Sequence, residues 1–281
     1  MLRLMLAAAL LALAMPASTD DQWVGFGSGA CTMCHADTHA GTHAGLAATA
    51  GPGNACESCH GPSAAHLVVG PDGVRPPPPG PTDTQCATCH ADVGSLHWPH
   101  SAHARAGVSC TDCHVVHVPR DPAGIRAAQF DRCTDCHQDV ASAFHRPSSH
   151  PVLSGALACT DCHNPHGSRG DAALVRDSVN ETCYACHADL RGPFLWEHPP
   201  VREDCSTCHL PHGSVHDKLM TARTPYLCQQ CHLAQFHPSV ALSGTTVPPS
   251  GASSSMLLRN CMNCHTQVHG SNHPSGVRQT R

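Results

Sequence analysis

Hydrophobic residues occur in this chain as short runs and isolated positions, and polar residues interrupt them before a regular period is established. A strand should show apolar and polar residues in alternation over several positions, and no convincing run of that kind is present. Short helical turns are predicted instead, with somewhat longer helices over residues 181–190, 226–237 and 256–265. The predicted fold is mostly irregular, with short helices and little or no sheet.

One longer apolar run lies at the N-terminus, where Arg3 precedes hydrophobic residues from Leu4 to Met15 and small residues through Ser18. A basic residue, a short apolar segment and small residues are typical of a secretory signal peptide. An anchor helix is the alternative, but about twelve apolar residues are too few to cross a bilayer. We expect residues 1–18 to be a signal peptide and residues 19–281 to form the exported protein.

Two stretches have the composition of connecting segments. Residues 71–81 are dominated by proline and glycine and predict an extended, exposed linker. Residues 239–255 are rich in Ser, Gly, Thr and Pro and predict a loop. Neither is expected to be a domain boundary.

The composition is too poor in core-forming side chains for an ordinary globular domain. Leu, Val, Phe and Ile together make 46 of the 281 residues, about 16%, which is in the range where a chain without cofactors tends to be disordered. The formal charge is -5 with histidine neutral, and no basic stripe is present, so nucleic-acid binding has no support. Something other than side chains must supply the apolar interior.

The cysteines indicate what that is, because all 20 of them lie in Cys-x-x-Cys pairs that are followed at once by histidine. This pattern attaches a c-type haem: the thiols take the vinyl groups as thioethers, and the histidine becomes the proximal iron ligand. Ten covalently attached haem c groups are therefore expected. In chain order, motifs 1 to 10 are Cys31/Cys34/His35, Cys56/Cys59/His60, Cys86/Cys89/His90, Cys110/Cys113/His114, Cys133/Cys136/His137, Cys159/Cys162/His163, Cys183/Cys186/His187, Cys205/Cys208/His209, Cys228/Cys231/His232 and Cys261/Cys264/His265.

Structural zinc sites and disulfide frameworks also use paired cysteines. Neither would require histidine directly after the second cysteine in ten cases of ten, when only 26 of 281 residues are histidine. Export agrees with the haem interpretation, since c-type haems are attached outside the reducing cytosol. The motifs form five serial pairs with periods of 45 to 56 residues, which is a repeat architecture.

Ten irons need ten further ligands, and the histidines outside the motifs follow a pattern. One follows each even-numbered motif within a few residues, and another lies between each odd-numbered motif and the next. A histidine three residues after a proximal histidine cannot easily reach the opposite face of the same ring, so it is expected to ligate a neighbouring haem. The predicted distal ligands are His43, His66, His103, His117, His150, His166, His198, His212, His237 and His269.

Three of these choices have close competitors: His39 for His43, His100 for His103, and His273 for His269. These competitors, with His97, His145 and His216, are expected to lie on the surface or to support the ligands. Methionine raises the reduction potential relative to histidine, and Met220 and Met256 are the plausible rivals. Low-potential bis-histidine ligation is expected throughout. Asp161 and Glu197 lie beside haem ligands and are expected to orient histidines or tune potentials through hydrogen bonds.

A catalytic haem needs an open coordination position, whereas every motif here ends in histidine and the distal candidates outnumber the irons. No Ser/His/Asp arrangement, Gly-rich phosphate loop or pair of carboxylates forms a separate catalytic site. An electron carrier is therefore favoured over an enzyme, with a multihaem reductase as the alternative from that class.

The residues around the motifs resemble one family. The run 149–168 and the segments 179–184, 191–193, 195–198 and 268–276 are similar to the periplasmic decahaem cytochromes of the MtrA/DmsE type. The resemblance extends from about residue 29 to 276 and is most specific after His150, while residues 37–51 depart from the family's pattern. It implies a helix-poor fold of two pentahaem-like halves, and the family's distal positions carry over to the ten histidines above, with His273 also matching.

The resemblance also implies partners and a place. Members of this family sit inside an outer-membrane β-barrel porin of the MtrB type and exchange electrons with periplasmic or inner-membrane c-type cytochromes. The expected function is electron transport across the outer membrane, to or from an extracellular multihaem cytochrome, metal oxides, Fe(II) or a sulfoxide reductase. A soluble periplasmic electron shuttle is the alternative.

Overall fold

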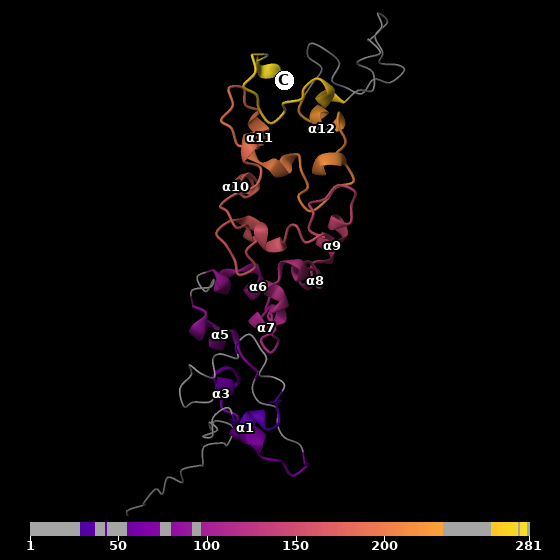
Figure 1. The fold of residues 1–281 in the computed structure, drawn as a ribbon. Coiled ribbons are helices and arrows are strands. Elements are labelled where there is room, and N and C mark those ends of the chain that lie inside the picture. Colours follow the sequence, from indigo (N-terminus) through magenta and orange to yellow (C-terminus); the bar gives the residue numbers. More distant parts are fainter. Residues whose placement is uncertain are drawn as a thin grey trace, which may run out of the picture. The chain divides into compact units, whose positions relative to one another are not determined.

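A computed structural model describes residues 29–36, 43, 55–73, 80–91, 97–232, 260–274 and 276–279 of the chain. The predicted signal peptide, most of the proline-rich linker and the predicted loop 239–255 lie outside the described residues. Within the described part, helices are short, and β-structure is limited to four isolated bridges (Figure 1). The predicted fold class of short helices without sheet is confirmed there.

No α-helix in the described ranges exceeds seven residues. The α-helices are α1 (Gly29–Thr32), α3 (Ala55–His60), α4 (Ala64–Leu67), α5 (Asp83–Cys89), α6 (Ala102–Arg105), α7 (Cys110–Cys113), α8 (Gln129–Thr134), α9 (Gln138–Phe144), α10 (Val179–Tyr184), α11 (Pro199–Glu203) and α12 (Tyr226–Gln229). The 3-10 turns are η3 (Trp98–His100), η4 (Pro122–Gly124), η5 (Arg126–Ala128), η6 (Cys159–Asp161), η7 (Asp171–Ala173), η8 (Ala188–Leu190), η9 (Cys205–Thr207), η10 (Asp217–Leu219), η11 (Cys261–Asn263) and η12 (Gly276–Arg278).

These turns carry the attachment motifs, as predicted. At nine of the ten motifs the N–H of the proximal histidine donates to the carbonyl of the first cysteine at 2.9 to 3.1 Å. Side-chain caps fix where several of the turns begin: Ser178 accepts from the N–H of Glu181, Asp204 from Ser206 and Asn260 from Met262. Each motif is thereby presented on one compact turn.

The prediction of a continuous helix over residues 181–190 is wrong. Helix α10 ends at Tyr184, and His187 has a ψ of 50°, outside the helical range, before η8 begins at Ala188. The helix predicted over 226–237 likewise ends at Gln229, and its last five residues lie outside the described part. Of residues 256–265, only 260–265 are described, and they form the 3-10 turn η11. In motif 7 the helix therefore ends before the second cysteine and the proximal histidine.

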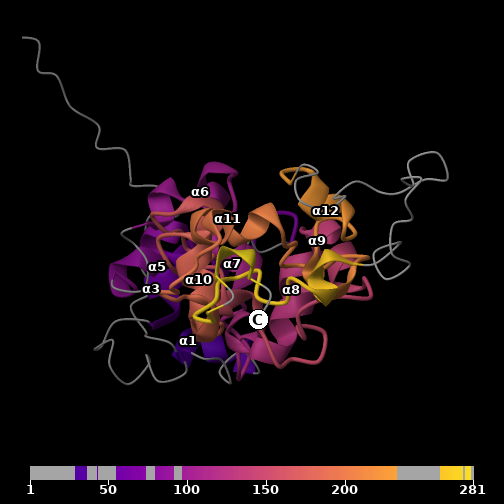
Figure 2. The same ribbon diagram turned by 90° about the horizontal axis from the view of Figure 1, so that it is seen from above.

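Contacts divide the chain into two compact units. The first contains the described residues up to His90 together with Val115–Arg120, and it holds motifs 1 to 3. The second contains Ala91–His114 and the described residues from Asp121 onward, and it holds motifs 4 to 10. This boundary does not coincide with the midpoint between two sets of five motifs. Within the second unit, α6 and α7 lie toward one end and α11 and α12 toward the other, with α9 and α10 between them (Figure 1). Viewed along this direction, α10 and α11 lie near α6 and α7, and α12 lies near α8 and α9 (Figure 2).

Side chains alone form almost no hydrophobic core. Among the described residues, the buried hydrophobic side chains are Phe144, Val152 and Ala158. Phe144 packs edge-on against Phe130 with ring centroids 6.1 Å apart. The composition predicted this shortage. No helix in the described ranges is long and apolar enough to cross a membrane.

Candidate haem-binding sites

Nine motif histidines each lie next to one histidine from outside the motifs. The ring centroids in these pairs are 5.8 to 6.4 Å apart. The pairs for motifs 1 to 9 are His35–His66, His60–His117, His90–His43, His114–His166, His137–His103, His163–His212, His187–His150, His209–His269 and His232–His198. The structure thus places nine of the predicted distal candidates opposite a motif histidine, and the tenth, His237, lies outside the described residues.

The spacing within these pairs fits an iron held between two imidazoles. A metal–imidazole bond is about 2 Å long, so two of them in line separate the nitrogens by about 4 Å. The Nε2 atoms of His43 and His90 lie 3.5 Å apart. The angle between rings varies from 13° to 88° while the spacing hardly changes, as expected because a ligand ring can rotate about its bond to the metal.

A rule connects each pair to the order of motifs in the chain. A histidine that follows one even motif pairs with the proximal histidine of the preceding even motif. His166, which follows motif 6, thus lies opposite His114 of motif 4. The histidine between an odd motif and the next pairs with the following odd motif, so His150 lies opposite His187. His66 has no earlier even motif and lies opposite His35 of motif 1. Except for His35 and His66, which belong to the same repeat, the paired histidines therefore come from neighbouring repeats.

The structure also places the competing residues. His103 lies opposite His137 while His100 is exposed in η3, and His269 lies opposite His209 while His273 is exposed. Competitors His39 and Met256 lie outside the described residues. Met220 forms a backbone bridge with His209, and its carbonyl accepts the Ser214 hydroxyl at 2.5 Å.

Backbone carbonyls orient six of the candidate ligands. A carbonyl oxygen can only accept, so each of these Nδ1 atoms carries the proton, which leaves the Nε2 lone pair free for a metal. The distances lie between 2.6 and 2.9 Å. The donor and acceptor residues are His163 to Ala172, His209 to Lys218, His265 to Arg278, His103 to Pro165, His150 to Pro211 and His198 to Val268.

The accepting carbonyls follow a second regularity. Three belong to the residue directly before a distal candidate: Pro165 before His166, Pro211 before His212, and Val268 before His269. A hydrogen bond therefore joins the distal candidates of two adjacent sites. Of the proximal acceptors, Ala172 and Lys218 have φ of 52° and 58°, a left-handed conformation that non-glycine residues rarely adopt.

A glycine follows each of these three even-motif distal candidates. Gly167, Gly213 and Gly270 have φ of 103°, 156° and 132°. A Cβ atom on Gly213 would lie 2.0 Å from the carbonyl oxygen of Ala143, and one on Gly270 would lie 2.2 Å from the ring of Phe194. A neighbouring segment therefore packs directly against the backbone that carries the ligand.

The two cysteines of a motif differ in how far the chain covers them. At all ten motifs the first cysteine is half-buried, and so are the second cysteines Cys113 and Cys208. The other eight second cysteines are exposed. They are Cys34, Cys59, Cys89, Cys136, Cys162, Cys186, Cys231 and Cys264.

The cysteines of successive motifs interact in two alternating ways. Within pairs 5/6, 7/8 and 9/10 the first cysteines lie within hydrogen-bonding reach of each other, as Cys133 and Cys159 do. That shared bond raises the pKa of Cys133 and lowers the pKa of Cys159. Between pairs, the second cysteine of an even motif interacts electrostatically with the next motif, for example Cys208 with Cys231. The attachment points therefore form a continuous series from motif 4 to motif 10.

Buried amides join adjacent motif turns. Asn180 of α10 donates to the carbonyls of Val201 and Arg202 at 2.9 and 3.0 Å and accepts from the N–H of Cys205 at 2.8 Å. Gln129 of α8 accepts from both the N–H and the hydroxyl of Thr160. Sequence reasoning missed both amides. Their position three or four residues before an odd-numbered motif was the available signal.

Asp161 and Glu197 do not make the expected hydrogen bonds to histidine in the described part of the chain, and their effect on reduction potentials stays a prediction. Asp161 binds Arg126 through both oxygens, at 2.5 and 2.7 Å, and this hydrogen bond lowers the pKa of Asp161. Glu197 binds Arg202 at 2.7 Å. The carboxylate that does contact a candidate ligand is Asp121, which accepts from Nδ1 of His114. Motif 4 lacks the His-Gly-Ser sequence found after motifs 6, 8 and 10, and that absence was the available signal.

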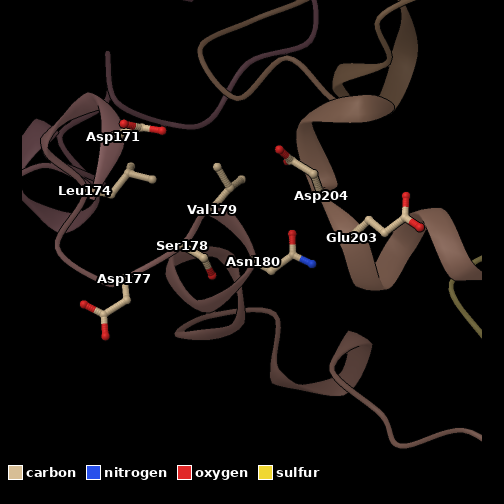
Figure 3. Close-up of a pocket in the computed structure, with 8 residues that line it drawn as sticks. All are labelled: Asp171, Leu174, Asp177, Ser178, Val179, Asn180, Glu203 and Asp204. Carbon is tan, nitrogen blue, oxygen red and sulfur yellow. The ribbon is translucent and has the colours of Figure 1, made fainter. Parts of the chain in front are cut away.

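A hollow of about 230 Å³ lies beside Asn180 and is lined by four carboxylates, those of Asp171, Asp177, Glu203 and Asp204 (Figure 3). The amide of Asn180 is fully used by its three backbone partners. In the described ranges no group of three or more His, Cys, Asp or Glu side chains is arranged to hold a metal ion by itself. The recurring arrangement is instead the two-histidine pair beside a cysteine motif.

Known proteins share the cysteine motifs. A family model described as a doubled CXXCH motif matches residues 100–142, 150–192 and 198–236. Each matched range holds an even motif followed by an odd one. The family model therefore pairs motifs 4 with 5, 6 with 7 and 8 with 9, whereas the five pairs described above each begin with an odd motif. Over 266 residues, the chain is 42% identical to the multiheme cytochrome MtrA of Shewanella baltica (strain OS185), covering 89% of this chain and 80% of that protein.

Proposed function

Because the chain belongs to the MtrA family of multihaem cytochromes, we propose that it conducts electrons across the outer membrane through ten covalently bound haem c groups, inside a porin partner. Membership makes it an electron-transfer protein with covalent haem c rather than an enzyme. We propose in addition that the haems number ten, that the electrons cross the outer membrane and that a porin surrounds the protein.

The observation that carries the proposal is the set of nine histidine pairs at nearly constant spacing. When bound, each haem iron supplies reversible one-electron transfer. The chain contributes two histidines per site, and together they would hold the iron. A site closed in this way leaves no position for a substrate, which favours electron transfer over bond chemistry.

The proposed ligands are the motif histidine and its partner at each of motifs 1 to 9. For His265 of motif 10, we assign His237 as the partner. It is the predicted distal ligand left over once the other nine have paired, just as His66 is left for motif 1. At each end of the series, a histidine that has no neighbouring repeat to ligate then pairs with a motif of its own repeat.

The alternating cysteine contacts support a continuous path within the second unit. Each motif from 5 to 9 has cysteine contacts with the motifs before and after it. In the first unit, Cys59 of motif 2 interacts with Cys86 and Cys89 of motif 3. Because thioethers fix the edges of the rings, short distances between cysteines favour short distances between neighbouring cofactors.

Chain size is compatible with a crossing. A compact chain of about 263 residues has a radius of gyration of about 18 Å and a diameter of about 47 Å. A bilayer with its headgroups is about 40 to 45 Å thick. The proposed place is the periplasmic side of the outer membrane, in a β-barrel porin of the MtrB type. Periplasmic or inner-membrane c-type cytochromes would meet one end, and an extracellular cytochrome, metal oxide, Fe(II) or reductase the other.

Electron transfer across a liposome wall tests the proposal. Vesicles that hold a redox dye receive the cytochrome, the candidate porin or both, and an external reductant or oxidant is added. Transfer is expected only with both proteins, and Cys183→Ser with Cys186→Ser should slow it by removing one site inside the series. His273→Ala is the matched control. If none of the three preparations conducts although the haems reduce fully in solution, the conduit is excluded and a soluble shuttle is the better account.

A further inference from the structure

Motif 4 differs from the other even motifs of the second unit in the group that receives the proximal Nδ1 proton. At motifs 6, 8 and 10 the acceptor is a neutral backbone carbonyl, reached at 2.6 to 2.8 Å. At motif 4 the acceptor is the carboxylate of Asp121, seven residues after His114. The hydrogen-bond donor is equivalent in all four sites, while the acceptor at motif 4 carries a full negative charge.

Local structure holds this carboxylate in place. Its other oxygen accepts the N–H of Ala123 at 3.1 Å and caps η4, where Pro122 occupies the first turn. The Asp121 side chain is 18% exposed and that of His114 is 38% exposed. The carboxylate is thus built into the site.

A carboxylate acceptor changes the ligand chemically. Hydrogen bonds to charged groups are roughly twice as strong as neutral ones, and a carboxylate on the outer nitrogen of a metal-bound histidine raises the basicity of the ligand. A more basic ligand stabilises the ferric over the ferrous state. We propose that Asp121 is a positioning residue that lowers the reduction potential of the iron held by His114 and His166 relative to the sites of motifs 6, 8 and 10. This inference rests on the ligand pairs proposed above.

Such a site has a functional consequence in a series of carriers. Among the even motifs of the second unit, an electron would meet its highest energy level at motif 4, where the chain passes from the second unit through residues 115–120 of the first unit and back. Asp121 and His114 flank that segment, which carries His117 opposite His60. The hydrogen bond from His114 to Asp121 also holds the two ends of the 115–120 segment together. The test must therefore separate the effect of the Asp121 charge from this structural role.

Asp121→Asn separates them, because an amide oxygen still accepts from Nδ1 but carries no charge. Spectroelectrochemical titration of the full holoprotein should show one centre moving to higher potential, with haem content and the low-spin spectrum unchanged. Asp171→Asn is the matched control, since it removes a carboxylate beside the carbonyl used by His163 and leaves that hydrogen bond intact. It should not move any centre to the same extent.

His166→Met assigns the shift, because methionine ligation raises the potential of that centre and separates it from the bis-histidine group. Adding Asp121→Asn should move this separated centre further upward. A shift in another centre, or Asp121→Asn titrating as the wild type while Asp121→Ala loses low-spin haem, would overturn the tuning role and leave only loop closure. Failure of the ligand pairs themselves would instead appear as missing low-spin haem in the wild-type protein.

Discussion

The imidazole rings of His43 and His90 stand at 88° to each other, with centroids 5.8 Å apart. The rings of His60 and His117 have nearly the same spacing but lie at 13°. When two axial imidazoles are perpendicular, the two iron d-orbitals that overlap with them remain nearly equal in energy, whereas parallel rings split them. Sites with the same ligands are thus made electronically different by the backbone.

This difference predicts the electron paramagnetic resonance spectrum of the oxidised protein. The iron of motif 3 should give the most anisotropic low-spin signal, because its two rings are nearest to perpendicular. His43→Ala should abolish that signal, and the neighbouring His39→Ala should leave it in place. The reverse result would make His39 the ligand and would contradict the pairing seen at His90.

The choice between His269 and His273 gives a second prediction. His269 is half-buried, and burial lowers its pKa, whereas His273 is exposed. Replacing His269 by alanine should therefore convert one haem from low spin to high spin in the visible spectrum. Replacing His273 by alanine is the matched control and should retain every low-spin centre. Two equal losses would mean that both residues are needed to hold the site.

Gly213 should tolerate no side chain. A Cβ atom there would meet the carbonyl oxygen of Ala143 at 2.0 Å, and that contact involves backbone that cannot move aside cheaply. Gly213→Ala is expected to cost about 3 kcal/mol or more of stability and to disturb ligation by the adjacent His212. Gly124→Ala, with nothing within 4 Å of its Cβ, is the control. Equal thermal unfolding of the two variants would contradict the close packing.

Asn180 should contribute strongly to the stability of the fold although it is not a candidate ligand. Asn180→Leu leaves two carbonyls and one N–H without their present partner, and each unsatisfied buried group costs about 1 to 3 kcal/mol. The variant should unfold at markedly lower denaturant concentration, and amide exchange should quicken around motifs 7 and 8 first. Gln138→Leu on the exposed start of α9 provides a comparison that should change little.

Local sequence patterns predicted the parts of this protein that depend on local chemistry. Cys-x-x-Cys-His is contiguous, so the attachment motifs could be read directly, and the poverty in Leu, Val, Phe and Ile predicted the small side-chain core. The short helices without sheet followed from the absence of periodic runs. The sequence also favoured His103 and His269 over His100 and His273, although spacing alone allows either residue of each pair.

Contacts that depend on how repeats fold together were beyond the sequence. Which histidine faces His114 is decided by residues about fifty positions away, and His103 is oriented by a carbonyl 62 residues further along. The helix predicted over residues 181–190 is too long, because α10 ends at Tyr184 and the backbone at His187 is outside the helical range. Asp121 was missed because no motif marks a carboxylate that reaches back to a ligand.

The last prediction concerns the chain without its cofactors. Among the described residues, the hydrophobic side chains that are buried are Phe144, Val152 and Ala158, and fixing each residue of the backbone costs about 1 to 2 kcal/mol of conformational entropy. So few buried apolar groups cannot offset that cost. Chain produced without haem attachment should therefore lack stable structure, with amide exchange close to that of an unfolded peptide. The variant with Cys183→Ser and Cys186→Ser should lose protection mainly around motif 7, since its other sites remain tied to the chain. Strong protection of α8 and α10 in the haem-free chain would show that side-chain packing suffices and that the porphyrins do not form the core.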